Sequence, residues 1–411
     1  MKNKNLSSVE KKLLEIKDLE NLSPQALKLL STPQKINRAT LSIGSQKIPA
    51  WRIMFNNALG PGKGGIRFHP AVSEKEIQSL AFLMAIKNAL TGLPYGGAKG
   101  GIKFNPKNTS LKQQEVISRK YIDAFYKELG QDKDIPAPDV YTNPQIMAWM
   151  LDEFEKKVGH HEPGMITGKP LELQGCCLRY NATAKGGFII TQALIKKFKL
   201  TKKKITVALQ GFGNAGAYLA QMLNQAGLKI IAVSDSQGGI YDKNGLDIEA
   251  VLKIKQTHKS VQDYTPAKQI SNSELLELPS DLLILAALED QITETNARNI
   301  KAHYIIEIAN GPITYEADKF LAENKVIIIP DVLANSGGVI ASYFEWAQNR
   351  TGNILDKHYL EKLLQEKMTT AWKEITTLAK QDQRSLDLRT SAYLLAIRKI
   401  LTAEKLRGHL H

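Results

Sequence analysis

The sequence predicts an α/β protein of two domains, and three observations support that fold class. Its 411 residues exceed one ordinary core, at about 150 residues per domain. A hydrophobic content of 43% with 29 glycines is typical of globular α/β chains. After about residue 180, short β-rich runs alternate with helical segments, as in a parallel sheet wound with helices. We therefore predict one domain at residues 1–180, to which a helix at 385–411 returns, and a second domain at 181–384.

The first domain is predicted from strands, glycine-rich turns and capped helices. Ser73 and Glu76 have the spacing of a capping box, and Gly92 is placed to end the helix that begins there. The other predicted segments are short amphipathic helices within 6–31, strands at 38–43, 48–55 and 102–104, glycine-rich turns at 60–70 and 96–101, and helices near 111–129 and 144–158.

The second domain is predicted from short apolar runs of the kind that are buried on both faces of a parallel sheet. Each run is followed by a segment with helical periodicity, so the strands are expected to run in the same direction. A long helix is expected at 387–406, near the end of the chain. The predicted strands are 205–209, 229–233, 282–285, 304–308 and 326–329.

The formal net charge of +14, from 55 Lys and Arg against 41 Asp and Glu, raises the question of nucleic-acid binding. The lysines are scattered along helical stretches, and the longest run covers only residues 202–204. Aromatic residues make up 7% of the chain, without the aromatic signature of an RNA-binding sheet. We therefore expect a solvated basic surface that attracts small anions, and no nucleic-acid partner.

The two cysteines, Cys176 and Cys177, are adjacent, which favours free thiols in a reducing compartment over a disulfide or a zinc site. No stretch approaches the roughly 20 apolar residues that span a membrane. The first residues are charged and lack the apolar core of a secretory signal. We expect a cytoplasmic protein that binds neither a membrane nor a metal.

The segment ITVALQGFGNAG predicts a strand, a tight turn and a helix. Gly211, Gly213 and Gly216 satisfy the GxGxxG pattern, in which glycines permit the turn and let the backbone approach a pyrophosphate. The helix N-terminus then faces the negative charge of the ligand. Phe212 and Asn214 lie in the same turn and are included among the cofactor-binding residues. The second domain is thereby predicted to be a Rossmann-type dinucleotide-binding domain.

Asp235 stands at the end of the next predicted strand, nineteen residues after Gly216. An acid at this position can accept hydrogen bonds from both ribose hydroxyls of NAD, and it repels the 2′-phosphate of NADP. Ser234 and Ser236 flank it and can accommodate a phosphate. We expect NAD to be the preferred cofactor, with NADP possible.

Three lysines stand in glycine-rich segments or on the helix between them: Lys63 in GPGKGG, Lys87 in AIKNAL and Lys99 in GGAKGG. Glycine neighbours leave room for a substrate to press against the backbone. Burial and mutual repulsion would lower a lysine pKa toward neutrality, where the neutral amine acts as a base. The three lysines predict a cationic site for an anionic substrate. Lys87 taken alone is equally consistent with a surface lysine whose stem covers apolar neighbours.

Several motifs follow one another along the chain: GPGKGGIRFHPAVSEKEIQSLAFLMAIKNALTGLPYGGAKGGIKFNP, PAPDVYTNPQIMAWMLDEF, GKPLELQG, GFGNAG, SDSQGGIYD, AALEDQIT, EIANGPIT and PDVLANSGGVIASYFEWAQN. Over roughly residues 25 to 408, this series closely resembles the glutamate/leucine/phenylalanine/valine dehydrogenase family. The resemblance implies an NAD(P)-dependent amino-acid dehydrogenase that closes its two domains around its ligands. It also implies a homohexamer assembled through the first domain.

The resemblance implies a role for each matching residue. Lys99 matches the catalytic lysine that activates the attacking water, and Asp139 matches the acid that carries a proton to and from the substrate nitrogen. Lys87 matches the lysine that binds the α-carboxylate. Lys63 and Ser342 match the pair that binds the side-chain carboxylate. Residues on the cofactor side are implied to be Thr183, Asn310 and Asn335.

Lys63 is the residue that narrows the substrate. Relatives that act on leucine, valine or phenylalanine carry an apolar residue there, and a buried ammonium facing an isopropyl group would be unpaired. We therefore expect glutamate, 2-oxoglutarate and ammonium as the small-molecule partners, with hydride transferred to NAD(P). The alternatives are a leucine, valine or phenylalanine dehydrogenase, and a non-catalytic NAD-binding regulatory protein. Retention of Lys99 and Asp139 argues against the second of these.

Overall fold

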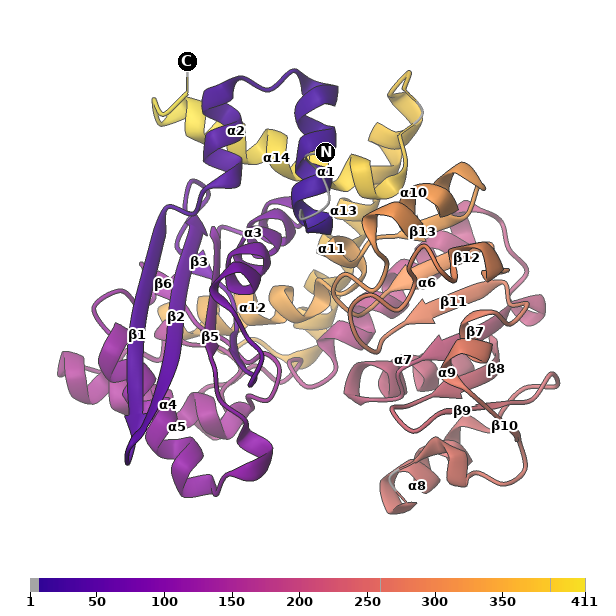
Figure 1. Ribbon diagram of the computed structural model, residues 1–411, viewed down its shortest axis with the longest axis horizontal. Coiled ribbons are helices and arrows are strands. Elements are labelled where there is room, and N and C mark those ends of the chain that lie inside the picture. The colour runs from indigo at the N-terminus through magenta and orange to yellow at the C-terminus, as the bar shows by residue number, and fades with distance from the viewer. Residues whose placement is uncertain (1–6, 259, 385, 411) are drawn as a thin grey trace. The chain divides into compact units, whose positions relative to one another are not determined.

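The computed structural model describes residues 7–258, 260–384 and 386–410, which group into two compact units (Figure 1). Each unit is assembled from three segments, so the units are interleaved along the chain. Residues 339–363 group with the N-terminal unit, although they lie inside the segment predicted as the second domain. The N-terminal unit contains residues 13–180, 339–363 and those from 393 onward, and the central unit contains residues up to 12, 181–338 and 364–392.

The N-terminal unit is built on a four-stranded sheet with the order β1-β2-β5-β4. Neighbouring strands are antiparallel except β4 and β5, which are parallel. A separate parallel pair joins β3 to β6. The strands are β1 (Lys35–Ile43), β2 (Gln46–Asn56), β3 (Gly62–Lys63), β4 (Ile66–Phe68), β5 (Gly97–Ile102) and β6 (Asp134–Ile135).

Helices cover this sheet and bury both of its faces along β5. Helix α3 (Glu74–Leu90) packs against β5 and β2, while α4 (Leu111–Phe125) packs against β1 and α5 (Pro144–Val158). Ser73 caps α3 as predicted, because its hydroxyl accepts a hydrogen bond from the Glu76 amide, while the Glu76 side chain accepts one from Arg67. Every residue of β5 therefore lies in the buried interior of the unit.

The prediction of a glycine-rich turn at 96–101 is wrong, because this segment forms strand β5. A Cβ on Gly97 would lie 2.4 Å from the amide nitrogen of Ala85 in α3, and one on Gly100 would lie 2.4 Å from the hydroxyl of Tyr121. Glycine inside a strand marks the close approach of another element. The turn predicted at 60–70 likewise contains the short strands β3 and β4.

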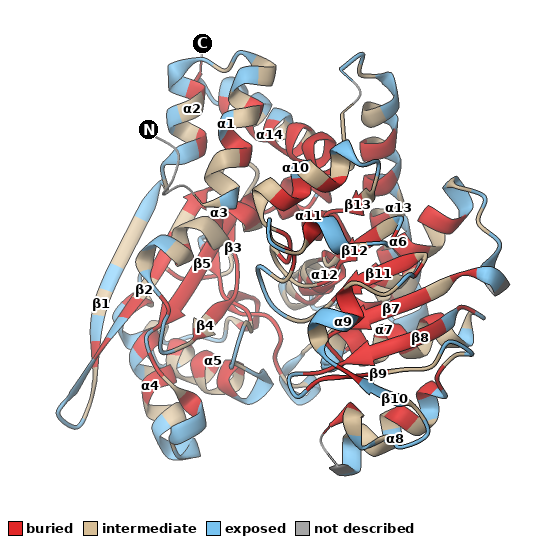
Figure 2. Cartoon of the chain, turned by 45° about the vertical axis from the view of Figure 1, so that its right-hand side comes forward, coloured by how far each residue is buried: buried red, intermediate tan, exposed pale blue. Residues whose placement is uncertain are grey.

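The central unit is built on a seven-stranded sheet with the order β10-β9-β8-β7-β11-β12-β13. The five predicted strands are confirmed and are parallel to one another. Two strands that were not predicted, β9 (Gly239–Tyr241) and β10 (Lys268–Ile270), extend one edge in antiparallel fashion. The parallel strands, almost wholly buried in Figure 2, are β7 (Thr206–Gln210), β8 (Lys229–Ser234), β11 (Leu282–Leu285), β12 (Tyr304–Glu307) and β13 (Ile327–Ile329).

Strand order in the central unit reverses at β7, which has β8 on one side and β11 on the other. Ligands of such sheets bind outside the carboxyl ends of the strands at this switch point. Helix α7 (Asn214–Gln225) packs against β7 and β8, and α10 (Tyr315–Glu323) packs against β13. Further helices of the unit are α6 (Ala182–Lys197), α8 (Ile248–His258), α9 (Asn272–Leu276) and α11 (Asp331–Ala334).

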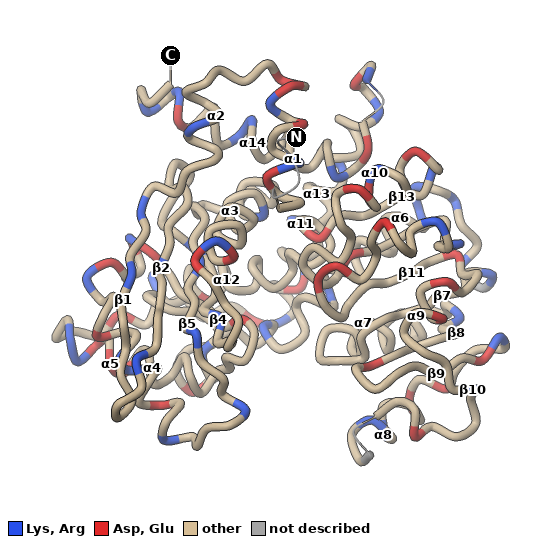
Figure 3. The backbone as a smooth tube through the Cα atoms, in the orientation of Figure 1, with Lys and Arg blue, Asp and Glu red and all other residues tan. Residues whose placement is uncertain are grey.

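The remaining helices come from the two ends of the chain and from its last third. The helices predicted within 6–31 and at 387–406 are observed, while residues 6, 385 and 411 of the predicted segments lie outside the described residues. Basic and acidic residues are scattered along the backbone of both units (Figure 3). In the part of the chain that the structure describes, no helix has the length and apolarity to cross a membrane. These helices are α1 (Ser8–Glu20), α2 (Pro24–Ser31), α12 (Gly337–Thr351), α13 (Lys357–Gln381) and α14 (Leu388–Leu406).

Candidate active site

A buried ion pair joins two of the predicted residues in the N-terminal unit. Lys99 projects from β5, and its Nζ donates a hydrogen bond of 2.6 Å to Oδ1 of Asp139. The other carboxylate oxygen of Asp139 accepts a hydrogen bond of 2.8 Å from Nε of Arg67, on β4. The Asp139 amide donates to the hydroxyl of Thr142 at 2.7 Å, which fixes the backbone of this loop. One carboxylate is therefore held between two cations.

The electrostatics of this pair suit proton transfer. Burial lowers the pKa of Lys99, the charge of Asp139 raises it and that of Arg67 lowers it, so the pKa ends below its ordinary value. Burial alone would raise the pKa of Asp139, but Lys99 and Arg67 together hold it well below its usual range. Asp139 thus stays ionised, and Lys99 can release and recover a proton beside it.

Lys63, on β3, is buried in a different environment. Its Nζ donates to the hydroxyl of Thr167 at 2.7 Å and to the carbonyl oxygens of Pro136 and Ile135 at 3.0 and 3.2 Å. Burial lowers the pKa of Lys63 well below its ordinary value. Its described partners are all neutral oxygens, so an anionic ligand would supply the carboxylate that these partners do not.

Lys87 and Ser342 are also buried in the N-terminal unit, at 7% and 2% exposure. Lys87 lies in the last turn of α3, and Ser342 lies in α12. The burial of Lys87 does not fit the alternative of a surface lysine whose head remains in water. All five predicted substrate-side residues therefore belong to one unit.

Two cationic residues in this region were missed by sequence reasoning. Arg67 binds Asp139, and Arg179 lies close enough for its charge to lower the pKa of Lys63. In the described part of the chain, Nε of Arg179 is buried and has no hydrogen-bond partner. The sequence offered one signal for Arg67, a charged residue between two apolar ones in GGIRFHP. Arg179 and Lys63 together give this region an excess of buried positive charge.

A fully buried ion pair supports the Lys63 pocket. Nζ of Lys169 donates to Oε1 of Glu345 on α12 at 2.6 Å, and the Gly168 amide donates to Oε2 at 2.9 Å. Thr167, which accepts from Lys63, directly precedes these residues. Glu345 lies one helical turn after Ser342 on α12. The pair therefore fixes the loop that holds Lys63 to the helix that carries Ser342.

The expected reason for the glycines beside these lysines is wrong. A Cβ on Gly64 would lie 1.6 Å from the carbonyl oxygen of Ala98, and one on Gly65 would lie 2.6 Å from that of Pro138. The glycines make room for neighbouring backbone, whereas we expected them to make room for a substrate. They let the strand with Lys63 lie close to the strand with Lys99.

In the central unit, the glycine turn after β7 has the three environments that a dinucleotide site requires. Gly211 has a φ of +97°, and a Cβ there would meet the backbone of Ala286 at 2.5 Å. A Cβ on Gly216 would lie 1.9 Å from the carbonyl oxygen of Gly211. Gly213, by contrast, faces open space within 4 Å. The turn thus fits a pyrophosphate lying against Gly213, at the N-terminus of α7.

Asp235 directly follows β8 and is already engaged by the protein. Its carboxylate accepts hydrogen bonds from Nζ of Lys255 at 2.6 Å and from the amides of Val261 and Gln237 at 2.9 Å. Burial alone would raise the pKa of Asp235, but these three donors lower it by more, so the pKa ends below its ordinary value and the carboxylate is ionised. Lys255 was not foreseen from the sequence, and it offsets the negative charge on which the NAD preference was based.

The remaining cofactor-side residues also lie in the central unit. Asn335, the C-cap of α11, donates from Nδ2 to Oδ1 of Asn310 at 3.0 Å, so these two predicted residues meet. Thr183 lies half-buried in the first turn of α6, and Asn214 is the first residue of α7. The side chain of Phe212 is buried, so only its backbone can face a ligand.

A mostly parallel sheet with an open glycine at its switch point in one unit, and a buried lysine–aspartate pair in the other, are typical of dinucleotide-dependent dehydrogenases. Residues 36–156 match the model of the Glu/Leu/Phe/Val dehydrogenase dimerisation domain. Residues 175–408 match the model of the Glutamate/Leucine/Phenylalanine/Valine dehydrogenase domain. The chain therefore belongs to the glutamate/leucine/phenylalanine/valine dehydrogenase family, and the resemblance and the fold class predicted from the sequence are confirmed.

Individual relatives match over nearly the whole chain. The NADP-specific glutamate dehydrogenase of Saccharolobus shibatae is 42% identical, with 97% of this chain and 95% of the relative covered. The cryptic catabolic NAD-specific glutamate dehydrogenase GudB of Bacillus subtilis is also 42% identical, over 95% of this chain and 93% of the relative. A Leu-bound crystal structure of the hetero-hexameric glutamate dehydrogenase of Thermus thermophilus is 31% identical, with a TM-score of 0.91 and coverages of 97% and 95%.

Proposed function

We propose that the protein catalyses the reversible oxidative deamination of L-glutamate to 2-oxoglutarate and ammonia with NAD(P). The observation that carries this substrate is the buried ammonium of Lys63, whose described partners are all neutral oxygens. The γ-carboxylate of glutamate would replace one of these partners and accept a charge-assisted hydrogen bond from Lys63. A leucine or valine side chain would instead leave the buried charge unbalanced.

Different residues are proposed to bind the two carboxylates of glutamate. We propose that Lys63 and Ser342 hold the γ-carboxylate and that Lys87 holds the α-carboxylate. Burial of all three supports this, since a charge-assisted hydrogen bond is strongest away from water. Arg179 adds a positive charge near Lys63, and in the described part of the chain its Nε is buried without a hydrogen-bond partner.

The proton steps belong to Lys99 and Asp139. The bound dinucleotide supplies the acceptor for the hydride that leaves the α-carbon of the substrate. Neutral Lys99 takes a proton from the water that attacks the resulting imine carbon. The Asp139 carboxylate, ionised at rest, receives this proton from Lys99 and passes it on to the departing nitrogen. The 2.6 Å contact between them allows a proton to pass without a change of position.

On the cofactor side, we propose that NAD is preferred, through Asp235 and the turn at Gly211, Phe212, Gly213, Asn214 and Gly216. The hydroxyls of the adenine ribose would add to the donors around the Asp235 carboxylate. Lys255 reduces the repulsion that a 2′-phosphate would meet, so NADP is accepted at lower efficiency. Thr183, Asn310 and Asn335 are proposed to face the nicotinamide end.

We further propose that the protein is a homohexamer assembled through its N-terminal unit. The family model for residues 36–156 is that of a dimerisation domain. Strand β1, nine residues long, is an edge strand of its sheet in the described part of the chain, and edge strands pair readily with another copy. Light scattering should give six times the mass of one chain, and a monomer would contradict the proposal.

The substrate is tested with a panel of glutamate, leucine, valine and phenylalanine, each with NAD and with NADP. We expect kcat/KM for glutamate to exceed that for each apolar amino acid by at least about 100-fold, because those leave Lys63 unpaired. A branched-chain substrate that equals glutamate would overturn the substrate assignment and keep the dehydrogenase class. No turnover of any amino acid, with dinucleotide binding intact, would favour the non-catalytic alternative.

A further inference from the structure

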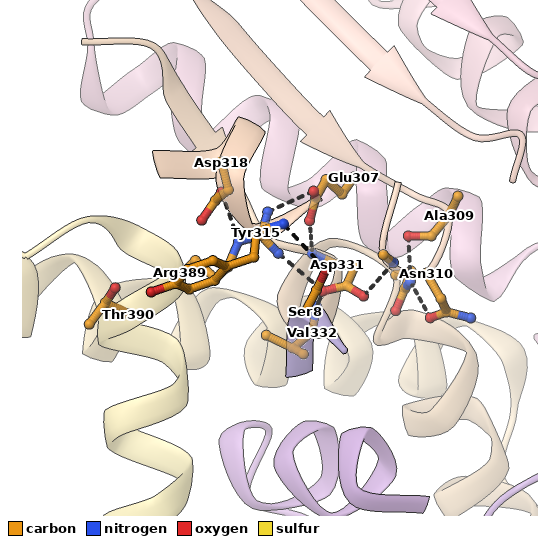
Figure 4. Close-up of polar contacts among 12 residues, drawn as sticks. Ser8, Glu307, Ala309, Asn310, Tyr315, Asp318, Asp331, Val332, Arg389 and Thr390 are labelled. Carbon is orange, nitrogen blue, oxygen red and sulfur yellow. Dashed lines mark hydrogen bonds and ion pairs between the residues drawn. The ribbon is translucent and has the colours of Figure 1, made fainter. Parts of the chain in front are cut away.

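A second charged cluster, remote in sequence from the lysine motifs, lies entirely within the central unit (Figure 4). Arg389, in the first turn of α14, is 9% exposed. It donates from Nη2 to Glu307 at 2.6 Å and from Nε to Asp318 at 2.9 Å, and its Nη1 lies 3.6 Å from Asp331. One guanidinium therefore joins the end of β12, the helix α10 and the start of α11 to the start of α14.

The cluster has more negative groups than positive ones. Three buried carboxylates surround Arg389, and burial together with its two acidic neighbours raises the pKa of Glu307 to about 7, against the pull of Arg389. Buried charge clusters are weak contributors to stability, because desolvation offsets most of the attraction. Stability alone is therefore a poor account of this arrangement.

One carboxylate of the cluster reaches the cofactor side. Oδ2 of Asp331 accepts a hydrogen bond of 3.0 Å from the amide of Gly311, the residue after Asn310. The Asp331 amide in turn donates to Oε2 of Glu307 at 2.8 Å, which satisfies the first amide of α11. Asp331 thereby fixes the loop that follows β12 to the start of α11.

The same short helix carries the second asparagine. The amide of Asn335 donates to the carbonyl oxygen of Asp331 at 3.2 Å, and its Nδ2 donates to Oδ1 of Asn310 at 3.0 Å and to the carbonyl oxygen of Ile308 at 3.2 Å. The residue before helix α11, Pro330, has no side chain that can cap the helix, and the amide of Val332 donates instead to Oδ1 of Asp331 at 2.8 Å. The orientation of α11 therefore depends on the bonds that Glu307 and Asp331 make outside the helix.

We propose that Arg389 and Asp331 are positioning residues for the dinucleotide, because they hold the Gly311 amide and α11 so that Asn310 and Asn335 meet the ligand as one unit. This inference rests on the proposed cofactor role of the two asparagines. The Asp331 carboxylate accepts hydrogen bonds from the amides of Gly311 at 3.0 Å and Val332 at 2.8 Å, which fix its orientation. Arg389, 3.6 Å away, adds a positive charge beside it. The cluster thus links the first turn of α14, which belongs to the central unit, to the loop after β12.

Asp318 provides a matched control within the cluster. Asp318 and Asp331 both lie beside Arg389, but of the two only Asp331 is bonded to Gly311 in the described structure. We expect Asp331→Ala to weaken NADH binding by about tenfold, the size of a typical indirect effect on a site, while Asp318→Ala leaves the Kd within twofold. Both variants should lower Tm, since each removes a buried carboxylate beside Arg389.

The measurement is the Kd for NADH from titration calorimetry on the full chain, with Tm recorded for each variant. Arg389→Lys keeps the positive charge but loses the planar guanidinium that contacts several carboxylates at once. We expect it to weaken NADH binding three- to tenfold. The Asp331→Ala/Arg389→Lys double variant should bind no more weakly than Asp331→Ala alone, because the two residues act through one path. Equal losses of affinity in the Asp318 and Asp331 variants, or full additivity, would overturn the positioning role.

Asn310→Ala separates this inference from the proposed function. If it binds NADH as tightly as the parent protein, the cofactor role of Asn310 is wrong and the positioning inference falls with it. If it weakens binding while Asp331→Ala does not, the cofactor role stands and only the positioning inference is overturned.

Discussion

Two buried lysines in the N-terminal unit, Lys99 and Lys63, project from neighbouring strands of the same glycine-rich region and have opposite surroundings. Lys99 contacts an ionised carboxylate, and that carboxylate is held by a second cation. Lys63 contacts one hydroxyl and two carbonyl oxygens. A lysine that exchanges protons benefits from a carboxylate in direct contact with it. A lysine that binds an anion has to leave that position to its ligand.

Lys169 shows what a purely structural lysine looks like in the same unit. Its ammonium is fully buried against Glu345 and also donates to the Ile166 carbonyl oxygen at 2.7 Å and to Asn349 at 2.8 Å. Its charge is balanced by a carboxylate that has further protein donors. The partners of a buried lysine, more than its burial, thus indicate its use.

The largest effect is expected at Lys99. Lys99→Ala removes the base, so kcat should fall about 100- to 10,000-fold, while the Kd for NADH stays within twofold. Lys103→Ala, an exposed lysine just past the end of β5, is the control and should retain parental kcat. Steady-state kinetics and a fluorescence titration of NADH provide the two numbers. A near-normal kcat would refute the base assignment.

The next effect is expected at Lys63. Lys63→Leu combined with Ser342→Val should lower kcat/KM for glutamate about 100-fold or more, because the γ-carboxylate loses its charge-assisted donors. Turnover of leucine should rise relative to glutamate in the same variant. Undiminished glutamate turnover would show that this pocket does not bind the side chain.

A smaller effect is expected at Arg67, which lowers the pKa of Lys99 and neutralises part of Asp139. Activity requires neutral Lys99, so kcat/KM rises as pH increases through the Lys99 pKa. Arg67→Met should raise that pKa and move the acid limb to higher pH by about one unit. Glu76→Gln keeps the arginine and should leave the limb near its original position. A shift to lower pH in Arg67→Met would contradict the account.

The smallest effect is expected at Lys255. Lys255→Met exposes the full charge of Asp235, so the ratio of kcat/KM for NADP to that for NAD should fall about two- to fivefold, the range of a partly exposed ion pair. Lys253→Met, an exposed lysine on the same helix α8, should leave the ratio unchanged. An increase in the ratio would mean that Lys255 does not mask Asp235.

The sequence predicted the parallel strands and the capped helix because each depends on local pattern: apolar runs, a serine cap and a GxGxxG turn. It did not predict β5 as a strand, since GGAKGG lacks the side chains by which strands are recognised. Contacts that depend on how the elements pack could not be predicted from the sequence either. Lys255 meets Asp235 only because α8 folds back, and Glu345 meets Lys169 across 176 residues. Local patterns indicate which residues matter, and tertiary packing decides what they face.

The Lys169–Glu345 pair also has a consequence for synthesis of the chain. Domains generally fold as units while the chain is being made, from the N-terminal end. Lys169, in the loop that holds Lys63, can form its ion pair only after Glu345 has left the ribosome. Asn56 of β2 can likewise donate to Glu404 only after residue 404 has been made. Until then the N-terminal unit lacks the carboxylate that pairs with Lys169.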